Sequence, residues 1–192
     1  MSKAVEVLNR DHRTFVRLLD LIEQEIELFG RAEQPDYALL EAVLEYFEGY
    51  PHCAHLPAEN LVYDKLMLRA PELCARFPDP GGEHQRHAEQ LTALRQLLRR
   101  VLDECEIPRD CVTDAARSFI RNMRRHLEME EGLFLPAARE NLRAEDWTEV
   151  DALLGESRHM ALRNGLSHYD DLRREIMRWS EERADTALCQ AG

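Results

Sequence analysis

Long uninterrupted hydrophobic stretches are missing from this 192-residue sequence. No run approaches the roughly 18 uncharged apolar residues that a membrane-spanning helix needs. The first residues, MSKAVEVLNRDHR, also lack the apolar centre of a signal peptide. We therefore expect a cytoplasmic protein that has no membrane partner.

Cysteine pairs with the close spacing of zinc knuckles or redox motifs are missing as well. The number of cysteines is odd, and none of them stands in a CxxC motif. Thiols stay reduced in the cytoplasm, so we predict free cysteines that mostly fill the core. The five are Cys53, Cys74, Cys105, Cys111 and Cys189.

Positive charge is scarce, because 25 Lys and Arg residues stand against 37 Asp and Glu residues, for a net charge of −12. The basic residues are also interspersed with acidic ones, as in RREIMRWSEER. Such a chain repels phosphate backbones, so we expect no nucleic-acid partner. The apolar fraction of 44% and the charged fraction of 32% are typical of a globular domain with a sizeable core.

Alternating strand patterns are absent, and helical periodicity dominates the sequence. Long helices are predicted over approximately residues 2–29, 35–69, 83–105 and 109–141, the second kinked near Pro51 and Pro57. Short connections between long helices predict an all-α fold, an antiparallel up-down four-helix bundle over residues 1–142. Two short helices in residues 143–192 are expected to form a C-terminal extension that packs on the bundle or makes a homodimer.

Each long helix has an apolar face that polar residues interrupt. An unpaired imidazole in such a face would cost about 1–3 kcal/mol, and an unpaired carboxylate more, so these groups need a common partner. The face of the first helix contains Val5, Leu8, His12, Phe15, Leu19, Ile22 and Ile26. The face of the fourth contains Val112, Ala116, Phe119, Met123, His126, Glu130, Leu133 and Ala137. We expect Phe15, Phe119, Met123 and Leu133 to line the place where this common partner binds and to exclude water from it.

An internal repeat indicates two copies of one helical hairpin. His55 follows His12 by 43 residues, and the second pair of histidines is 42 residues apart. In each copy a glutamate stands four residues after the second histidine, about one turn along the same helix face. Distances counted from the two turns bring the four histidines to about one level, with the two glutamates one turn away on alternate helices. This arrangement predicts a metal site, and two carboxylates able to bridge suggest two metals. The predicted ligands are His12, His55, Glu59, His84, His126 and Glu130.

The sequence resembles the hemerythrin-like family of HHE cation-binding domains. The resemblance rests on NRDHRTFVRLLDLIE, YPHCAHLPAENLVYDKL, EHQRHAEQL, HLEMEEGLFLPA and RAEDW, and it covers roughly residues 4–148. It implies two non-haem irons joined by an oxo or hydroxo bridge. It also implies that His12, His55, His84 and His126 hold these irons while Glu59 and Glu130 bridge them. Leu56 departs from the HHPxE pattern of bacterial members, so this position offers no extra ligand.

The number of histidine ligands is left open by the sequence. The family's oxygen carriers have a second histidine four residues after the first on the third helix, where this chain has Ala88. His87 lies three residues after His84 and either supplies a fifth ligand or faces solvent. Without it, the set resembles the hemerythrin domains of bacterial iron-centre repair proteins. The 192 residues do not include the cysteine-bearing N-terminal domain of those proteins.

The resemblance implies a protein that binds or senses O2 or a related oxidant such as nitric oxide, rather than a catalyst. Zinc or another divalent cation suits the same ligands, because affinity alone does not select iron. Two alternatives stay open: a redox protein of iron homeostasis or iron–sulfur-centre repair, and a metal-free structural or partner-binding bundle. A ferritin-like diiron oxidase needs ExxH motifs on two helices, and only Glu156 and His159 have that spacing.

Overall fold

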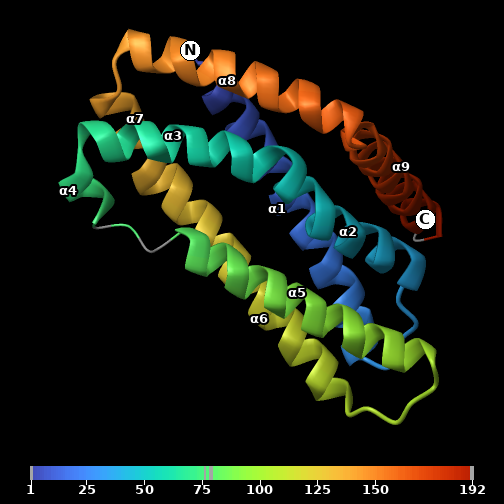
Figure 1. The fold of residues 1–192 in the computed structure, drawn as a ribbon. Coiled ribbons are helices and arrows are strands. Elements are labelled where there is room, and N and C mark those ends of the chain that lie inside the picture. The colour runs from blue at the N-terminus through green and yellow to red at the C-terminus, as the bar shows by residue number, and fades with distance from the viewer. Residues whose placement is uncertain (1, 76, 78–79, 191–192) are drawn as a thin grey trace.

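The structure, a computed structural model, describes residues 2–75, 77 and 80–190, with Pro80 and residues 183–190 described by their backbone only. Helices, turns and loops account for all of these residues, which confirms the all-helical prediction (Figure 1). No helix among them is long and apolar enough to span a membrane. The elements are α1 (Lys3–Gly30), α2 (Tyr37–Tyr50), η1 (Pro51–His55), α3 (Leu56–Arg69), α4 (Pro71–Cys74), α5 (Pro80–Leu102), α6 (Arg109–Met129), η2 (Glu130–Phe134), α7 (Leu135–Asn141), α8 (Ala144–Arg163) and α9 (Leu166–Gln190).

Long stretches of helix lie side by side around the core. Helix α1 contacts α2, α3 and α6, while α5 contacts α2 and α6 (Figure 1). All seven residues of the predicted inward face of α1 are buried, which confirms this face. Aromatic rings meet at the centre, where Phe47 lies 5.5 Å from Phe15 and 5.6 Å from Phe119 between ring centroids. Such pairs add to the stabilisation that burial of the rings provides.

Two π-helical turns interrupt the long helices at matching places. The turn η1 joins α2 to α3, and η2 joins α6 to α7. A proline, Pro57 or Pro136, stands two residues after the end of each turn. Proline has no N–H to give to an α-helical hydrogen bond, which favours a wider turn just before it. The kink at the first site is confirmed, whereas the second turn was not predicted.

The turn η2 shows that one sequence prediction is wrong. Regular helical periodicity places Leu133 on the inward face, yet this side chain is 58% exposed and Phe134 is only 4% exposed. The wide turn holds one residue more than an α-helical turn, so the inward position passes to Phe134. Leu133 therefore does not line the site.

The four cysteines whose side chains the structure describes are free thiols. Cys74 is buried and Cys53 is half-buried, whereas Cys105 and Cys111 are exposed. The expectation of unpaired cysteines is confirmed for these four. The expectation of mainly core positions is wrong, because Cys105, in the connection between α5 and α6, and Cys111, in the first turn of α6, are exposed. The side chain of Cys189 lies outside the described residues.

The C-terminal helices are longer than predicted. Helix α8 packs on α3 and α1, and α9 packs on α2 (Figure 1). The sequence suggested short helices because its apolar segments are separated by the polar stretch ESRHMALR. No proline stands in it, and α8 continues through Gly155 and this stretch as far as Arg163.

A close approach joins α9 to α2, because a Cβ atom added to Gly49 would overlap the ring of Tyr169. We expect Gly49→Ala to destabilise the protein by about 1–3 kcal/mol, since the tyrosine must move. Gly155→Ala is the control, because an added Cβ there meets nothing within 4 Å. It should stabilise α8 by about 0.5–1 kcal/mol. Urea unfolding measures both free energies, and a loss of the same size in both variants would contradict the contact.

An ion pair between Arg69 and Asp146 connects the end of α3 to the start of α8. Arg69 donates hydrogen bonds from Nε and Nη2 to Asp146 over 2.9 and 2.8 Å. These bonds, together with one from the backbone N–H of Arg143, lower the pKa of Asp146 to about 2. A carboxyl group whose pKa falls on folding stabilises the folded state above its unfolded pKa, near 4. That stabilisation is lost as the pH falls through the folded value.

The variant Asp146→Asn should therefore unfold at a lower temperature than the unchanged protein at pH 7. The gap between the two should shrink as the pH falls from about 4 to about 2, because the native carboxyl then becomes protonated. Glu145→Gln, at an exposed neighbouring position, should change the midpoint little at any pH. Thermal unfolding over this pH range is the measurement, and a gap that stays constant would contradict the role of the ion pair.

Candidate metal centre

The structure brings all six predicted ligands together in the core. Their donor atoms form two groups, and within each group the atoms lie within 4.8 Å of one another. Five of the six residues are buried, and the sixth, His84, has a side chain that is 15% exposed. The six candidate ligands are His12 in α1, His55 at the end of η1, Glu59 in α3, His84 in α5, His126 in α6 and Glu130 at the start of η2.

Glu130 belongs to both groups. One group contains this residue with His12 and His55, and the other contains it with Glu59, His84 and His126. Its Oε2 atom lies 2.9 Å from Nε2 of His12. Its Oε1 atom lies 2.9 Å from Nε2 of His126. The two oxygens thus face different groups, as those of a bridging carboxylate do. Glu59 faces only the second group, with Oε2 3.2 Å from Nε2 of His84.

The donor atoms at the centre are poorly satisfied by the rest of the protein. Within the described part of the chain, several of them are buried and have no hydrogen bond of good geometry; their nearest polar partners are one another, imidazole against carboxylate, 2.9–3.2 Å apart. Each such atom costs about 1–3 kcal/mol unless something else binds it. Imidazole nitrogens and carboxylate oxygens together suit iron or zinc, so this donor set fits divalent cations. The atoms are Nε2 of His12, Nε2 of His84, Oε2 of Glu59 and both oxygens of Glu130.

An acidic residue supports one histidine in each hairpin. Asp11 Oδ2 lies 3.5 Å from Nδ1 of His55, and Glu83 Oε2 lies 3.1 Å from Nδ1 of His126. A carboxylate behind one ring nitrogen fixes the orientation of the ring and leaves Nε2 directed at the centre. The two acids occupy matching positions in the internal repeat. Each directly precedes one histidine in the sequence and supports another histidine on a different helical segment.

Asp11 is held in a buried network. The hydroxyl of Tyr50 donates to Asp11 Oδ1 over 2.9 Å, and Arg10 Nη2 donates to the same oxygen over 2.9 Å. Burial alone would raise the pKa of Asp11, but His55 and Arg10 outweigh it and lower this pKa. Burial and the same carboxylate raise the pKa of Tyr50. Asp11 therefore stays ionised and can hold His55.

Glu131 contacts the ring of His12 from the other side, with Oε1 3.2 Å from Nδ1, although its side chain is 53% exposed. Glu131 is thus solvent-exposed, but its contact with His12 was not predicted from the sequence. Asp11, Glu83 and Tyr50 were missed altogether. Asp11 and Glu83 could have been found from the sequence, because each copy of the repeat has an acidic residue directly before its first histidine.

Proton affinities in the centre reflect competition between burial and neighbouring charges. Burial disfavours the charged form of His126, but Glu130 and other carboxylates outweigh it and raise the pKa of His126 to about 9. Glu130 and Glu131 likewise raise the pKa of His12 against burial. Burial raises the pKa of Glu59, whereas His12 and His126 hold that of Glu130 well below its usual range despite burial. A cation at this centre would displace protons from these imidazoles.

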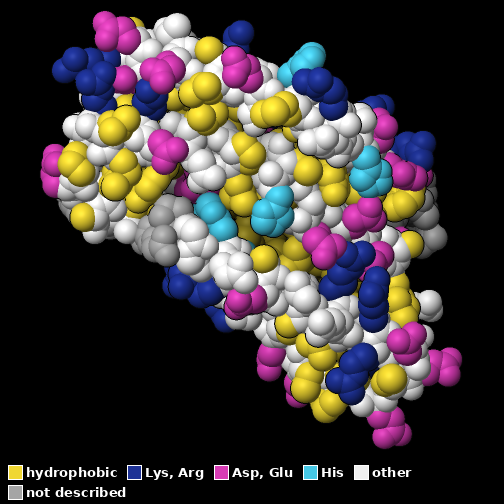
Figure 2. Space-filling view, viewed as in Figure 1, with side chains coloured by type: hydrophobic (Ala, Val, Ile, Leu, Met, Phe, Trp, Pro, Cys, Tyr) yellow, Lys and Arg dark blue, Asp and Glu magenta, His cyan; other side chains and the backbone are white. Residues whose placement is uncertain are grey.

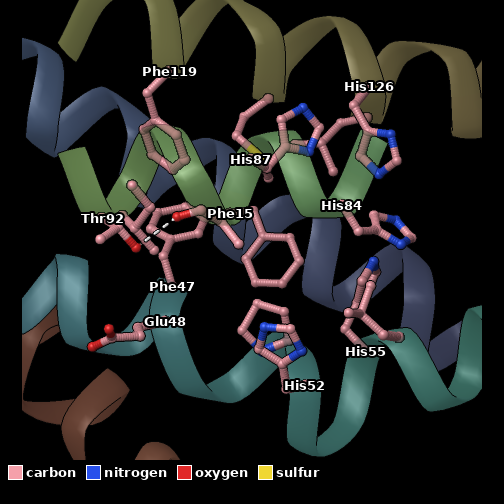
Figure 3. A pocket seen from close by; sticks show the side chains of 16 residues that line it. Phe15, Phe47, Glu48, His52, His55, His84, His87, Thr92, Phe119 and His126 are labelled. Carbon is pink, nitrogen blue, oxygen red and sulfur yellow. Dashed lines mark hydrogen bonds between the residues drawn. The ribbon is translucent and has the colours of Figure 1, made fainter. Parts of the chain in front are cut away.

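A cavity of about 230 Å³ lies beside the centre, between α5 and the segment formed by α2 and η1. Its mouth includes the exposed residues His52 and Thr92. On this face of the molecule, histidine side chains gather among hydrophobic ones between these helices (Figure 2). Inside, His55, His84 and His126 lie at one end, and Phe15 projects into the middle (Figure 3). The cavity thus connects the surface with the candidate ligands.

His87 lines this cavity and belongs to neither group of ligand atoms. Its ring packs edge-to-face on His126, with 5.0 Å between centroids (Figure 3). Burial, aided by His126, lowers the pKa of His87 to about 4, so the ring is neutral at pH 7. The sequence left open whether His87 supplies a fifth ligand or faces solvent. In the structure its ring faces the cavity instead (Figure 3).

A helical core with four imidazoles and two carboxylates facing one another defines a class of cation-binding helical proteins. The comparison with protein families agrees, because the model described as the hemerythrin HHE cation-binding domain matches residues 3–138. The chain belongs to this family, which confirms the resemblance seen in the sequence. Searches of curated proteins and of solved structures gave no significant match.

Proposed function

We propose that this protein holds two non-haem iron ions in its core and uses them to bind or sense dioxygen or a related oxidant such as nitric oxide. Residues 1–142 would form the metal-binding unit, an antiparallel four-helix bundle, and residues 143–192 would be an extension that covers α2 and α3. The observation that carries the proposal is that Glu130 is shared by two groups of buried donor atoms. The proposed ligands are His12, His55, Glu59, His84, His126 and Glu130.

Iron at this centre would supply the binding and reduction of a small oxidant, and the protein's own residues would set the surroundings. Asp11 and Glu83 orient two of the histidine rings. Phe15 and Met123, both buried in the cavity wall, keep water away from the inner end of the cavity. Water exclusion strengthens the electrostatic interactions among the remaining polar groups.

A redox or iron-centre repair role is the second candidate. It is favoured by the position of His87, because without this residue the proposed set remains four histidines and two glutamates. A metal-free bundle is the third candidate; it would pair the same histidines with Glu59 and Glu130, whose oxygens lie 2.9–3.2 Å from Nε2 of His12, His84 and His126, and it predicts no metal uptake. The ferritin-like alternative is disfavoured because Glu156 and His159 are exposed on α8.

Metal analysis and optical spectra test the proposal. After anaerobic reconstitution with ferrous iron, the protein should contain about two irons per chain, one for each ligand group. A band that appears in air and bleaches reversibly under argon would support oxygen binding, and rapid irreversible oxidation would support the redox role. Less than one iron per chain after reconstitution would contradict the two-iron centre.

A further inference from the structure

The cavity beside the metal centre is larger than a diatomic oxidant needs. Its volume is about 230 Å³. An apolar cavity of about 150 Å³ in another protein accommodates a benzene molecule. The space therefore matches one substituted aromatic ring or a small fused pair of rings, and a diatomic molecule would leave most of it unfilled.

The wall of the cavity has the chemistry of an aromatic binding site. Phe47 and Phe119 lie at the end away from the candidate ligands, and Phe15 lies between the two ends (Figure 3). Leu91 and Met123 complete a buried apolar wall. Aromatic side chains favour edge-to-face or offset packing with another ring, and the thioether of Met123 also packs well against aromatic rings.

The charges around the cavity favour a neutral occupant. Among the described lining residues, the only Asp, Glu, Lys or Arg is Glu48. Glu48 is exposed and forms an ion pair with Arg95. The ring of His126, whose pKa is raised, already faces the carboxylates of Glu83 and Glu130. A charged ligand would therefore lose its hydration without gaining an unpaired buried partner of opposite charge from the wall. Beside His126, the ring of His87 lines the cavity and offers its nitrogens for a hydrogen bond to a polar group of the ligand.

We propose that this cavity binds a neutral aromatic molecule with one hydroxyl or ring N–H group, of the phenol or indole class, whose polar group bonds to His87. The bound ring lies against Phe15 and Phe119, next to the imidazoles of the proposed metal centre. The inference goes beyond the binding of a small oxidant, and it holds for the protein with or without metal.

Titrations followed by fluorine NMR test the proposal on the full chain, both metal-free and loaded with zinc. The probes are 4-fluorophenol, fluorobenzene and 4-fluorobenzoate. We expect saturable binding of 4-fluorophenol and about tenfold weaker binding of fluorobenzene, the difference that one hydrogen bond makes. The benzoate should not bind. Absence of saturable binding by 4-fluorophenol, or equal binding of the benzoate, would overturn the proposal.

Three variants locate the bound probe. Ala88→Leu fills part of the cavity and should weaken 4-fluorophenol binding at least about tenfold. Ala93→Leu makes the same change at an exposed position of α5 outside this cavity and should leave binding unchanged. His87→Leu should weaken the phenol and leave fluorobenzene nearly unaffected. Circular dichroism checks that each variant is folded, and equal effects at positions 88 and 93 would place the probe elsewhere.

The outcome is separable from that of the metal proposal. Phenol binding without metal uptake would contradict the two-iron centre and leave the aromatic site standing. Metal uptake without phenol binding in either form would overturn the aromatic site and leave the two-iron centre standing.

Discussion

Replacement of Glu130 by glutamine is expected to reduce the metal content of the reconstituted protein from about two ions per chain to less than one. The two oxygens of Glu130 each lie 2.9 Å from a histidine nitrogen, one in each group of ligand atoms. An amide has nearly the same volume but no negative charge, and only one of its two polar atoms is an acceptor. Both metal positions should therefore be weakened, as measured by elemental analysis after ferrous or zinc loading.

Glu59→Gln should have a smaller effect than Glu130→Gln. Glu59 contributes to one group only, so about one ion per chain should remain, held by His12, His55 and Glu130. Glu128→Gln is the matched control, because this residue is exposed on the same helix as His126. It should retain both ions. Equal losses in the Glu59 and Glu130 variants would contradict the shared position of Glu130.

Removal of metal from the protein should lower its thermal unfolding midpoint by about 10 °C. A cation at about a thousand times its dissociation constant stabilises the native state by about 4 kcal/mol. In a chain of this size, each kcal/mol shifts the midpoint by about 2–4 °C. The physical source is the convergence of buried imidazole nitrogens and carboxylate oxygens that a cation can bind together. Calorimetry with saturating zinc and with a chelator measures the difference.

The double variant Glu59→Gln/Glu130→Gln supplies the control for this experiment. It should unfold at nearly the same temperature in zinc and in chelator, because a carboxylate is missing from each ligand group. If zinc raised its midpoint as much as that of the unchanged protein, the cation would be stabilising the chain at another place.

The convergence of the six side chains could be predicted from the sequence because helical geometry is regular over most of the chain. His12 lies within an apolar face, and each glutamate follows a histidine by four residues, so inward direction can be read from spacing alone. The repeat of the hairpin then indicated that the two halves meet. The convergence of all six side chains agrees with this reasoning.

Other features escaped the sequence because they depend on local departures from regular geometry or on contacts between helices. The π-turn before Leu135 shifts the helix phase, so Leu133 turns outward and Phe134 inward. The supports of the ligands join helices that are far apart in the sequence, as Asp11 does with His55. The division of roles between Glu59 and Glu130 also requires distances that no spacing rule supplies.

The most direct test of the two-metal centre is a crystal structure of the zinc- or iron-loaded protein with anomalous scattering at the metal edge. The account predicts two anomalous peaks on either side of the Glu130 carboxylate. One should lie among His12, His55 and Glu130, and the other among Glu59, His84, His126 and Glu130. A single peak away from Glu130, or no peak in the core of a fully loaded protein, would contradict the account.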